Sequence, residues 1–350
     1  MSSSFYPVPL LRHGLSMTIY TTLQSSRNWE KTICHQEPSY RDYIFQGANG
    51  VPLFGRIAIS DQPQGTIIGT YGITGDLDNQ WFLRLLGRKG WAENYAMVLF
   101  DWRAHGKTAE LSPSLTSDGL HEGEDFVRIA AQAKATGCPA PFWFTGYSLG
   151  GQLALWGVRA AETLSDWGND LPLEASEIGG AAVICPNLDT NRSLPYLVRS
   201  PLGRYIEQSI AKNLKNLAWR IYRHHPQSID PNAIERANSI WKFDEELVIK
   251  PLGFSSVEDY YKASSPLSFL NHLTKPTLII YAADDPMFDP SIIPDLDKAC
   301  KGNNQVELLL TKHGGHVHYL NSKKGQYLAN DSDVWWAWNR VLNWFLLNTY

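Results

Sequence analysis

The chain has 350 residues, of which 43% are hydrophobic and 19% charged, so it is long and apolar enough to bury one large core with an inserted subdomain. This composition excludes a disordered or fibrous protein. A formal net charge of −4 offers no broad positive field, so nucleic acid is not expected as a partner.

The first predicted elements form a β-hairpin, 42–45 and 53–59, joined by the turn residues Ala48-Asn49-Gly50. Six short, mostly apolar runs follow, as is typical of strands buried on both faces: 66–71, 95–100, 141–145, 180–185, 277–281 and 306–310. Helix-compatible segments lie between and after these runs: about 78–91, 120–136, 149–163, 292–301 and 332–347.

Strands that alternate with helices indicate an α/β fold with a mostly parallel sheet covered on both faces. The interval from about 188 to 273 breaks this alternation, because it has no convincing buried strand and is punctuated by prolines. We interpret it as an inserted helical cap. The predicted organisation is a core domain formed by 1–187 and 274–350, with the cap at 188–273 between its two parts.

Two aromatic segments have alternative interpretations. The segment 217–223 (LAWRIYR) is suited to a partner-binding or membrane-facing helix, but an amphipathic helix packed on the main domain is the simpler interpretation. The C-terminal segment 334–347 carries large apolar residues that would suit contact with lipid. We favour a last helix packed on the sheet.

The motif Gly146-Tyr-Ser148-Leu-Gly150 follows the apolar run PFWFT and precedes a helix-like segment. A GxSxG string alone is weak, since glycine and serine are common residues. Its position between strand and helix is what predicts a nucleophile elbow, in which glycines allow a tight, strained turn and the serine projects above the sheet. Ser148 is therefore the candidate nucleophile; the alternative is a serine in an ordinary turn.

A serine hydroxyl needs an imidazole base, and the base needs a carboxylate to fix its tautomer. In this type of fold the chain order is serine, acid, histidine. Asp284 and Asp285 follow the predicted strand 277–281, and we choose Asp285, with Asp284 capping or solvating the turn. After the next strand, His316 directly follows Gly314-Gly315, a pair that lets the loop fold back toward the serine.

His313 and His318 flank this candidate base and are expected to have local structural roles. Together the three histidines also spell HxxHxH, a pattern that invites a metal site. We disfavour this alternative, because no carboxylate accompanies the histidines in HExxH fashion and a loop would have to set the ligand geometry. No metal or other cofactor is expected.

An acyl-transfer site also needs two backbone N–H donors for the tetrahedral oxyanion. One is expected at Leu149, directly after the nucleophile. The loop after the first parallel strand, Thr70-Tyr71-Gly72-Ile73-Thr74-Gly75, is expected to supply the other, and we choose the N–H of Ile73.

With these residues placed, the sequence resembles the YheT-like, or embryogenesis-associated, branch of the α/β-hydrolases along nearly its whole length. The motifs that carry the resemblance occur in family order: Tyr6-Pro7, Arg12-His-Gly14 with Thr18-Ile19, 115–123, GYSLGG at 146–151, Phe243-Asp-Glu, Gly253-Phe, 259–265, Pro276-Thr-Leu, Asp284-Asp-Pro286 and Gly314-Gly-His-Val317. The resemblance implies an α/β-hydrolase fold and charge-relay roles for Ser148, Asp285 and His316. It also implies hydrolysis of carboxylic esters; several relatives act on glycerolipids, phospholipids or medium-chain fatty esters.

The sequence departs from the family pattern in three places. Tyr71-Gly72 stands where the family usually has His-Gly, Arg103-Ala-His-Gly106 replaces an Arg-Gly loop, and Val-His-Tyr follows His316 in place of Val-Gly-Phe. The departures affect the expected substrate preference more than the chemistry, because the backbone donors and the three relay residues are retained.

The sequence thus predicts a serine-dependent esterase or lipase-like enzyme acting on a small acyl ester, expected to be a lipid or fatty-acyl ester, with transient contact to lipid or a membrane surface. An acyltransferase that passes the acyl group to an alcohol, and a non-catalytic binding protein of the same fold, are the alternatives.

A cytoplasmic location is expected. The N-terminal segment is interrupted by Pro7, Pro9 and Arg12 before a signal peptide can form, and no stretch approaches the ~20 apolar residues of a membrane span. The cysteines lack metal-ligand or disulfide-framework spacing and are interpreted as reduced thiols: Cys34, Cys138, Cys185 and Cys300.

Overall fold

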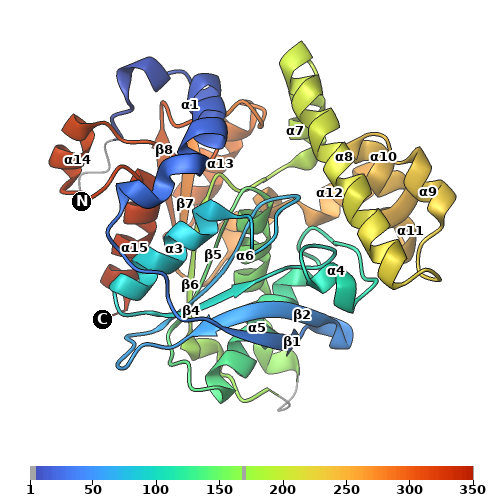
Figure 1. Ribbon diagram of the computed structural model, residues 1–350, viewed down its shortest axis with the longest axis horizontal. Coiled ribbons are helices and arrows are strands. Elements are labelled where there is room, and N and C mark those ends of the chain that lie inside the picture. Colours follow the sequence, from blue (N-terminus) through green and yellow to red (C-terminus); the bar gives the residue numbers. More distant parts are fainter. Residues whose placement is uncertain (1–4, 168–170, 350) are drawn as a thin grey trace.

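The computed structural model describes residues 5–167 and 171–349, and an eight-stranded sheet runs through its centre (Figure 1). The strands lie in the order β1-β2-β4-β3-β5-β6-β7-β8. Their bounds are β1 Arg41–Gln46, β2 Pro52–Ala58, β3 Thr66–Thr70, β4 Ala96–Phe100, β5 Phe142–Tyr147, β6 Ile178–Ile184, β7 Thr277–Ala282 and β8 Val306–Thr311. β2 is antiparallel to β1 and to β4, and the pairs from β4 onward are parallel.

The predicted strands are confirmed, with boundaries that shift by one or two residues. The hairpin of β1 and β2 turns through Ala48-Asn49-Gly50, where Asn49 and Gly50 have φ values of 58° and 71°. Every residue of β3, β4, β5 and β7 is buried, as expected for strands covered on both faces. The same expectation is wrong for β8, which lies at the edge of the sheet and exposes Glu307 and Leu310.

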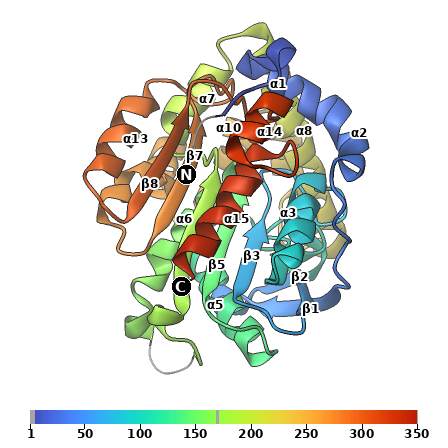
Figure 2. The same cartoon turned by 90° about the vertical axis from the view of Figure 1, so that its left-hand side faces the viewer.

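Helices cover both faces of the sheet. One face carries α3 (Trp81–Ala92) and α15 (Trp336–Asn348), which lie in front of the strands in Figure 2, and the other carries α5 (Glu122–Ala135) and α6 (Leu149–Ala161). Beside β8 lies α13 (Ile292–Lys301). These five helices match the predicted segments, and the α/β-hydrolase fold class is confirmed.

The interval between β6 and β7 contains helices and no strand in the described part of the chain. Its α-helices are α7 Thr190–Leu197, α8 Pro201–His224, α9 Pro231–Arg236, α10 Ile240–Phe243, α11 Ile249–Leu252 and α12 Val257–Ser264. They gather on one side of the sheet in Figure 1 and pack around their own apolar cluster, which includes Leu214, Phe243 and Tyr260. The aromatic segment 217–223 lies within α8, where Ala218 and Ile221 are buried.

The C-terminal helix α15 packs on the sheet, as favoured from the sequence. Trp336 and Trp338 are fully buried in the main core, and the indole N–H of Trp338 donates to the carbonyl of Phe82 at 3.0 Å. No helix in the described ranges is long and apolar enough to cross a bilayer. The four cysteines form no disulfide.

Four short α-helices of the described residues outside the interval between β6 and β7 were not predicted from the sequence: α1 (Gly14–Tyr20), α2 (Ser26–Asn28), α4 (Thr108–Leu111) and α14 (Lys323–Ala329). Helices of this length are marginal on their own and owe their stability to packing, so the local sequence carries little signal. α1 matters for the site, because it lies against the loop that carries His316.

Candidate active site

Ser148 occupies the sharp turn between β5 and α6, with φ of 54° and ψ of −129°. Two glycines permit this turn. A Cβ on Gly146 would come within 2.3 Å of the carbonyl oxygen of Gly150, and a Cβ on Gly150 within 2.3 Å of the carbonyl oxygen of Tyr71. A serine held at positive φ between a strand and a helix has the geometry of a nucleophile elbow.

The three side chains chosen from the sequence meet above the carboxyl ends of β5, β7 and β8. The Nε2 atom of His316 lies 3.0 Å from the Oγ of Ser148, and its Nδ1 atom lies 2.8 Å from Oδ2 of Asp285. Asp285 is 3% exposed, so its contact with the imidazole is shielded from solvent. The structure therefore brings together residues that are far apart along the chain.

The carboxylate of Asp285 is fixed by two donors. Its Oδ2 accepts the Nδ1–H of His316, and its Oδ1 accepts the backbone N–H of Met287 at 2.8 Å. With Nδ1 protonated, Nε2 presents its lone pair to the hydroxyl of Ser148, which is the tautomer that a general base requires.

Asp284, the other carboxylate considered, takes a different position. Its Oδ1 accepts the N–H of Gly315 at 3.0 Å, and its Oδ2 lies 3.5 Å from Nδ1 of His313. It therefore holds the loop that precedes His316 rather than bonding to His316 itself. The assignment of Asp284 to the turn agrees with this geometry.

The loop of His316 is also held by α1, a contact that was not predicted from the sequence. The hydroxyl of Thr18 accepts the backbone N–H of His316 and donates to the carbonyl of Gly14, both at 2.8 Å. A Cβ on Gly315 would lie 2.3 Å from that carbonyl oxygen. Gly14 and Thr18 belong to the family motifs near the N-terminus. The sequence therefore marked these residues, but it did not show that they contact the loop of His316.

The histidines of the HxxHxH string do not converge on one point. His318 stacks on Trp81 with 5.2 Å between ring centroids, and its Nδ1 lies 3.0 Å from Oγ1 of Thr21. Burial lowers the pKa of His318 to about 3, so the ring is neutral. His313 faces Asp284. Each of these two histidines thus contacts a separate structural partner.

The two proposed oxyanion donors lie beside the serine. Gly72 approaches it closely, since a Cβ there would lie 3.0 Å from the Cβ of Ser148. Ile73 and Leu149 line the same cleft as Ser148. Neither backbone N–H donates to an acceptor within residues 5–167 and 171–349, so both remain available to a ligand.

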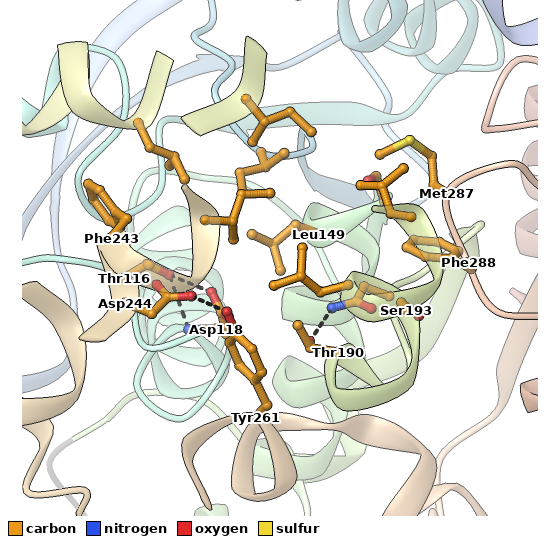
Figure 3. A pocket seen from close by; sticks show the side chains of 18 of the residues that line it. Thr116, Asp118, Leu149, Thr190, Ser193, Phe243, Asp244, Tyr261, Met287 and Phe288 are labelled. Carbon is orange, nitrogen blue, oxygen red and sulfur yellow. Dashed lines mark hydrogen bonds between the residues drawn. The ribbon is translucent and has the colours of Figure 1, made fainter. Parts of the chain in front are cut away.

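Ser148 opens into an apolar cleft between the sheet and the helices of 188–273. Figure 3 shows Leu149 near its middle, Met287 and Phe288 at one end and Phe243 at the other. Phe288 also meets the ring of His316 edge-on, with 5.2 Å between centroids. The mostly apolar lining suits an acyl chain.

Two buried carboxylates at the far end of this cleft were not predicted. Asp118 precedes α5, and Asp244 follows α10 and accepts the hydroxyl of Tyr261 at 2.5 Å (Figure 3). Burial, and then the charge of Glu122, raise the pKa of Asp118 to about 7. Burial, and then the charge of Asp118, raise the pKa of Asp244 well above its usual value.

The raised pKa values of Asp118 and Asp244 predict a contribution to the stability of the fold that is lost as the pH rises. A carboxyl whose folded-state pKa exceeds its unfolded value binds more protons in the folded protein, so its own contribution to the free energy of unfolding decreases between about pH 4 and pH 7, by up to about 1.4 kcal/mol per pH unit. Asp118→Asn removes the titration of this carboxyl. Asparagine also tolerates the positive φ of 49° at this position. We expect the variant to exceed the wild type in Tm by more at pH 8 than at pH 5.

Thermal unfolding followed at both pH values checks this prediction. Asp166→Asn, at an exposed position, is the matched control and should show the same small difference from wild type at both pH values. A Tm advantage of Asp118→Asn that does not change with pH would contradict it.

The comparisons with known proteins agree with the fold. A model of the alpha/beta hydrolase family matches residues 75–325. "Putative esterase slr0264" of Synechocystis sp. is 53% identical over 345 residues, which cover 97% of this chain and 94% of the relative. "Putative esterase YheT" of Escherichia coli is 32% identical over 60% of this chain and 56% of its own length. "Phospholipase ABHD3" of Mus musculus is 27% identical over 73% of this chain and 58% of its own length.

Among solved structures, the esterase Pf2001 of Pyrococcus furiosus has a TM-score of 0.55 and 16% identity over 89% of this chain and 93% of that chain, a likeness of fold. The family match spans most of the chain, and the Synechocystis relative matches it almost end to end. The chain belongs to the alpha/beta hydrolase family and, within it, to the YheT-like branch of carboxylic ester hydrolases.

Proposed function

We propose that the protein hydrolyses carboxylic esters through an acyl-enzyme formed on Ser148, with His316 as the base and Asp285 as its orienting carboxylate. The observation that carries this proposal is the continuous set of hydrogen bonds from Asp285 through His316 to Ser148. These bonds lie at the carboxyl edge of the sheet and open into an apolar cleft.

The geometry suggests the order of the steps. The Nε2 atom of His316 accepts the proton of Ser148 as its Oγ attacks the ester carbonyl, and Asp285 stabilises the imidazolium that forms. The N–H groups of Ile73 and Leu149 receive the developing oxyanion. The imidazolium then protonates the leaving alcohol. Water, deprotonated by the same imidazole, releases the acid from the enzyme.

The substrate class we propose is a lipid or other fatty-acyl ester. The cleft is lined mainly by aliphatic and aromatic side chains, and many of these come from the helices of 188–273, which we interpret as a cap. One relative is named a phospholipase, which is consistent with an acyl chain in such a cleft. Tyr205 is 71% and Leu202 38% exposed at the start of α8, where they would contact a lipid surface transiently.

Hydrolysis of p-nitrophenyl esters with two to sixteen acyl carbons tests the proposal. The wild-type protein should release p-nitrophenol well above the buffer rate for part of the series and lose this activity on treatment with an organophosphonate. No turnover at any chain length would favour a non-catalytic binding protein. Added glycerol separates hydrolysis from transfer, because an acyltransferase would form glycerol ester in place of free acid.

A further inference from the structure

We propose that His105 is a positioning residue for the oxyanion hole, which it organises by accepting a hydrogen bond from the backbone of Thr74. This inference rests on the proposed function, because it assigns the N–H of Ile73 to the oxyanion. His105 follows β4 in the turn Arg103-Ala-His-Gly106, one of the places where the sequence departs from the family pattern.

The hydrogen bonds of His105 define its tautomer. Its Nε2 lies 3.0 Å from the backbone nitrogen of Thr74, which can only donate. Nε2 is therefore the unprotonated nitrogen, and the proton resides on Nδ1, which donates to the carbonyl of Arg103 at 2.9 Å. Both ring nitrogens are satisfied in this neutral form, and protonation of Nε2 would break the contact with Thr74.

The ring of His105 is buried and stacked on a neighbouring aromatic side chain. It stacks on Trp102 with 3.5 Å between centroids and an interplanar angle of 23°, and the residue is 1% exposed. Burial lowers the pKa of His105 to about 4, which keeps the ring neutral at physiological pH. A fixed, neutral imidazole is a well-defined acceptor for one backbone N–H.

Thr74 needs such a partner. Its φ is 63°, a conformation that is unfavourable for a β-branched residue and persists only where the surroundings hold it. The amides of Ile73 and Thr74 flank the same Cα. Fixing the Thr74 N–H therefore restricts the direction of the Ile73 N–H, the group that we assign to the oxyanion.

Asp101, two residues before this turn, holds the oxyanion loop on either side of Thr74. Asp101 accepts the hydroxyl of Tyr71 at 2.5 Å and the N–H of Leu77 at 2.9 Å. Asp101 also accepts the N–H of Lys107, which closes the turn. Two of the departures from the family pattern are thus part of one set of hydrogen bonds that holds the oxyanion loop. They are Tyr71 and the turn that carries His105.

The test compares His105→Phe, which keeps a ring on Trp102 and loses the acceptor, with His105→Gln, whose Oε1 can accept from Thr74. Each variant is assayed with an ester and with its thionoester. Sulfur accepts hydrogen bonds poorly, so the ratio of the two rates reports the oxyanion donors. We expect His105→Phe to lower kcat for the ester by about 10²-fold, with KM little changed. The ratio of the ester rate to the thionoester rate should fall by a similar factor. His105→Gln should restore most of kcat and most of this ratio.

Equal losses on ester and thionoester, an unchanged ratio in His105→Phe, or a His105→Gln that matches His105→Phe would overturn the inference. If His105→Phe does not fold, Thr74 replaced by the α-hydroxy acid of the same side chain removes the donor instead, and the ratio should fall in the same way. Failure of the proposed function has separate signatures: the wild type would turn over no ester, or Ser148→Ala would retain the wild-type rate.

Discussion

Replacing Ser148 with alanine is expected to lower kcat for ester hydrolysis by roughly 10⁶-fold, to a residual rate that comes from binding and the oxyanion donors alone. The loss is large because the variant removes the atom that forms the acyl-enzyme. His316 and Asp285 would keep their mutual hydrogen bond, since it does not involve the serine. The measurement is the steady-state rate on the best p-nitrophenyl ester.

Ser165→Ala is the matched control. Ser165 is exposed beyond the C-terminal end of α6, whereas Ser148 lies before its N-terminal end, so its removal should leave the rate unchanged. A Ser148→Ala protein that is folded, as shown by an unchanged Tm, and still hydrolyses the ester would mean that another group is the nucleophile.

Asp285→Asn is expected to lower kcat by roughly 10⁴-fold. The amide of asparagine can donate to Nδ1 of His316, which would favour the tautomer protonated on Nε2 and leave no base for Ser148. In addition, the imidazolium formed during attack would lose its counter-charge. The ester assay checks this prediction, and Tm shows whether the variant remains folded.

Asp284→Asn provides the comparison at the neighbouring position. The Oδ1 atom of asparagine can still accept the N–H of Gly315, so the loop should keep its shape and the rate should fall by less than about tenfold. If Asp284→Asn proved the more damaging substitution, the roles of these two carboxylates would have to be exchanged.

The sheet was predictable because its strands have a strong local signature. Strands buried on both faces must be apolar throughout, and the helices between them end at recognisable turns, so the positions of β3 to β7 follow from the sequence. The edge strand β8 is only partly buried, and its position follows from the alternation of strands and helices. Ser148 was predictable for a related reason, since the elbow requires glycines at fixed offsets between a strand and a helix.

The choice of Asp285 over Asp284 was harder. Both carboxylates follow the same strand, and adjacent residues in a turn point in different directions that the local sequence does not specify. Counting from the strand end favoured Asp285, and the structure has Asp285 bonded to His316 and Asp284 bonded to Gly315.

The supporting contacts could not be predicted, because they join segments that are distant in the chain. Thr18 contacts a residue 298 positions away, and His105 reaches a loop that follows another strand. Asp118 and Asp244 come from separate segments, and neither local sequence predicts that the two carboxylates lie together. Partners of this kind depend on the packing of the whole fold rather than on a local pattern.

The most direct test of the account is to treat the protein with a fluorophosphonate, digest it and locate the adduct by mass spectrometry. We predict a single adduct on the peptide that contains Ser148, and no adduct in Ser148→Ala. An adduct on a different residue, or equal labelling of the alanine variant, would contradict the account.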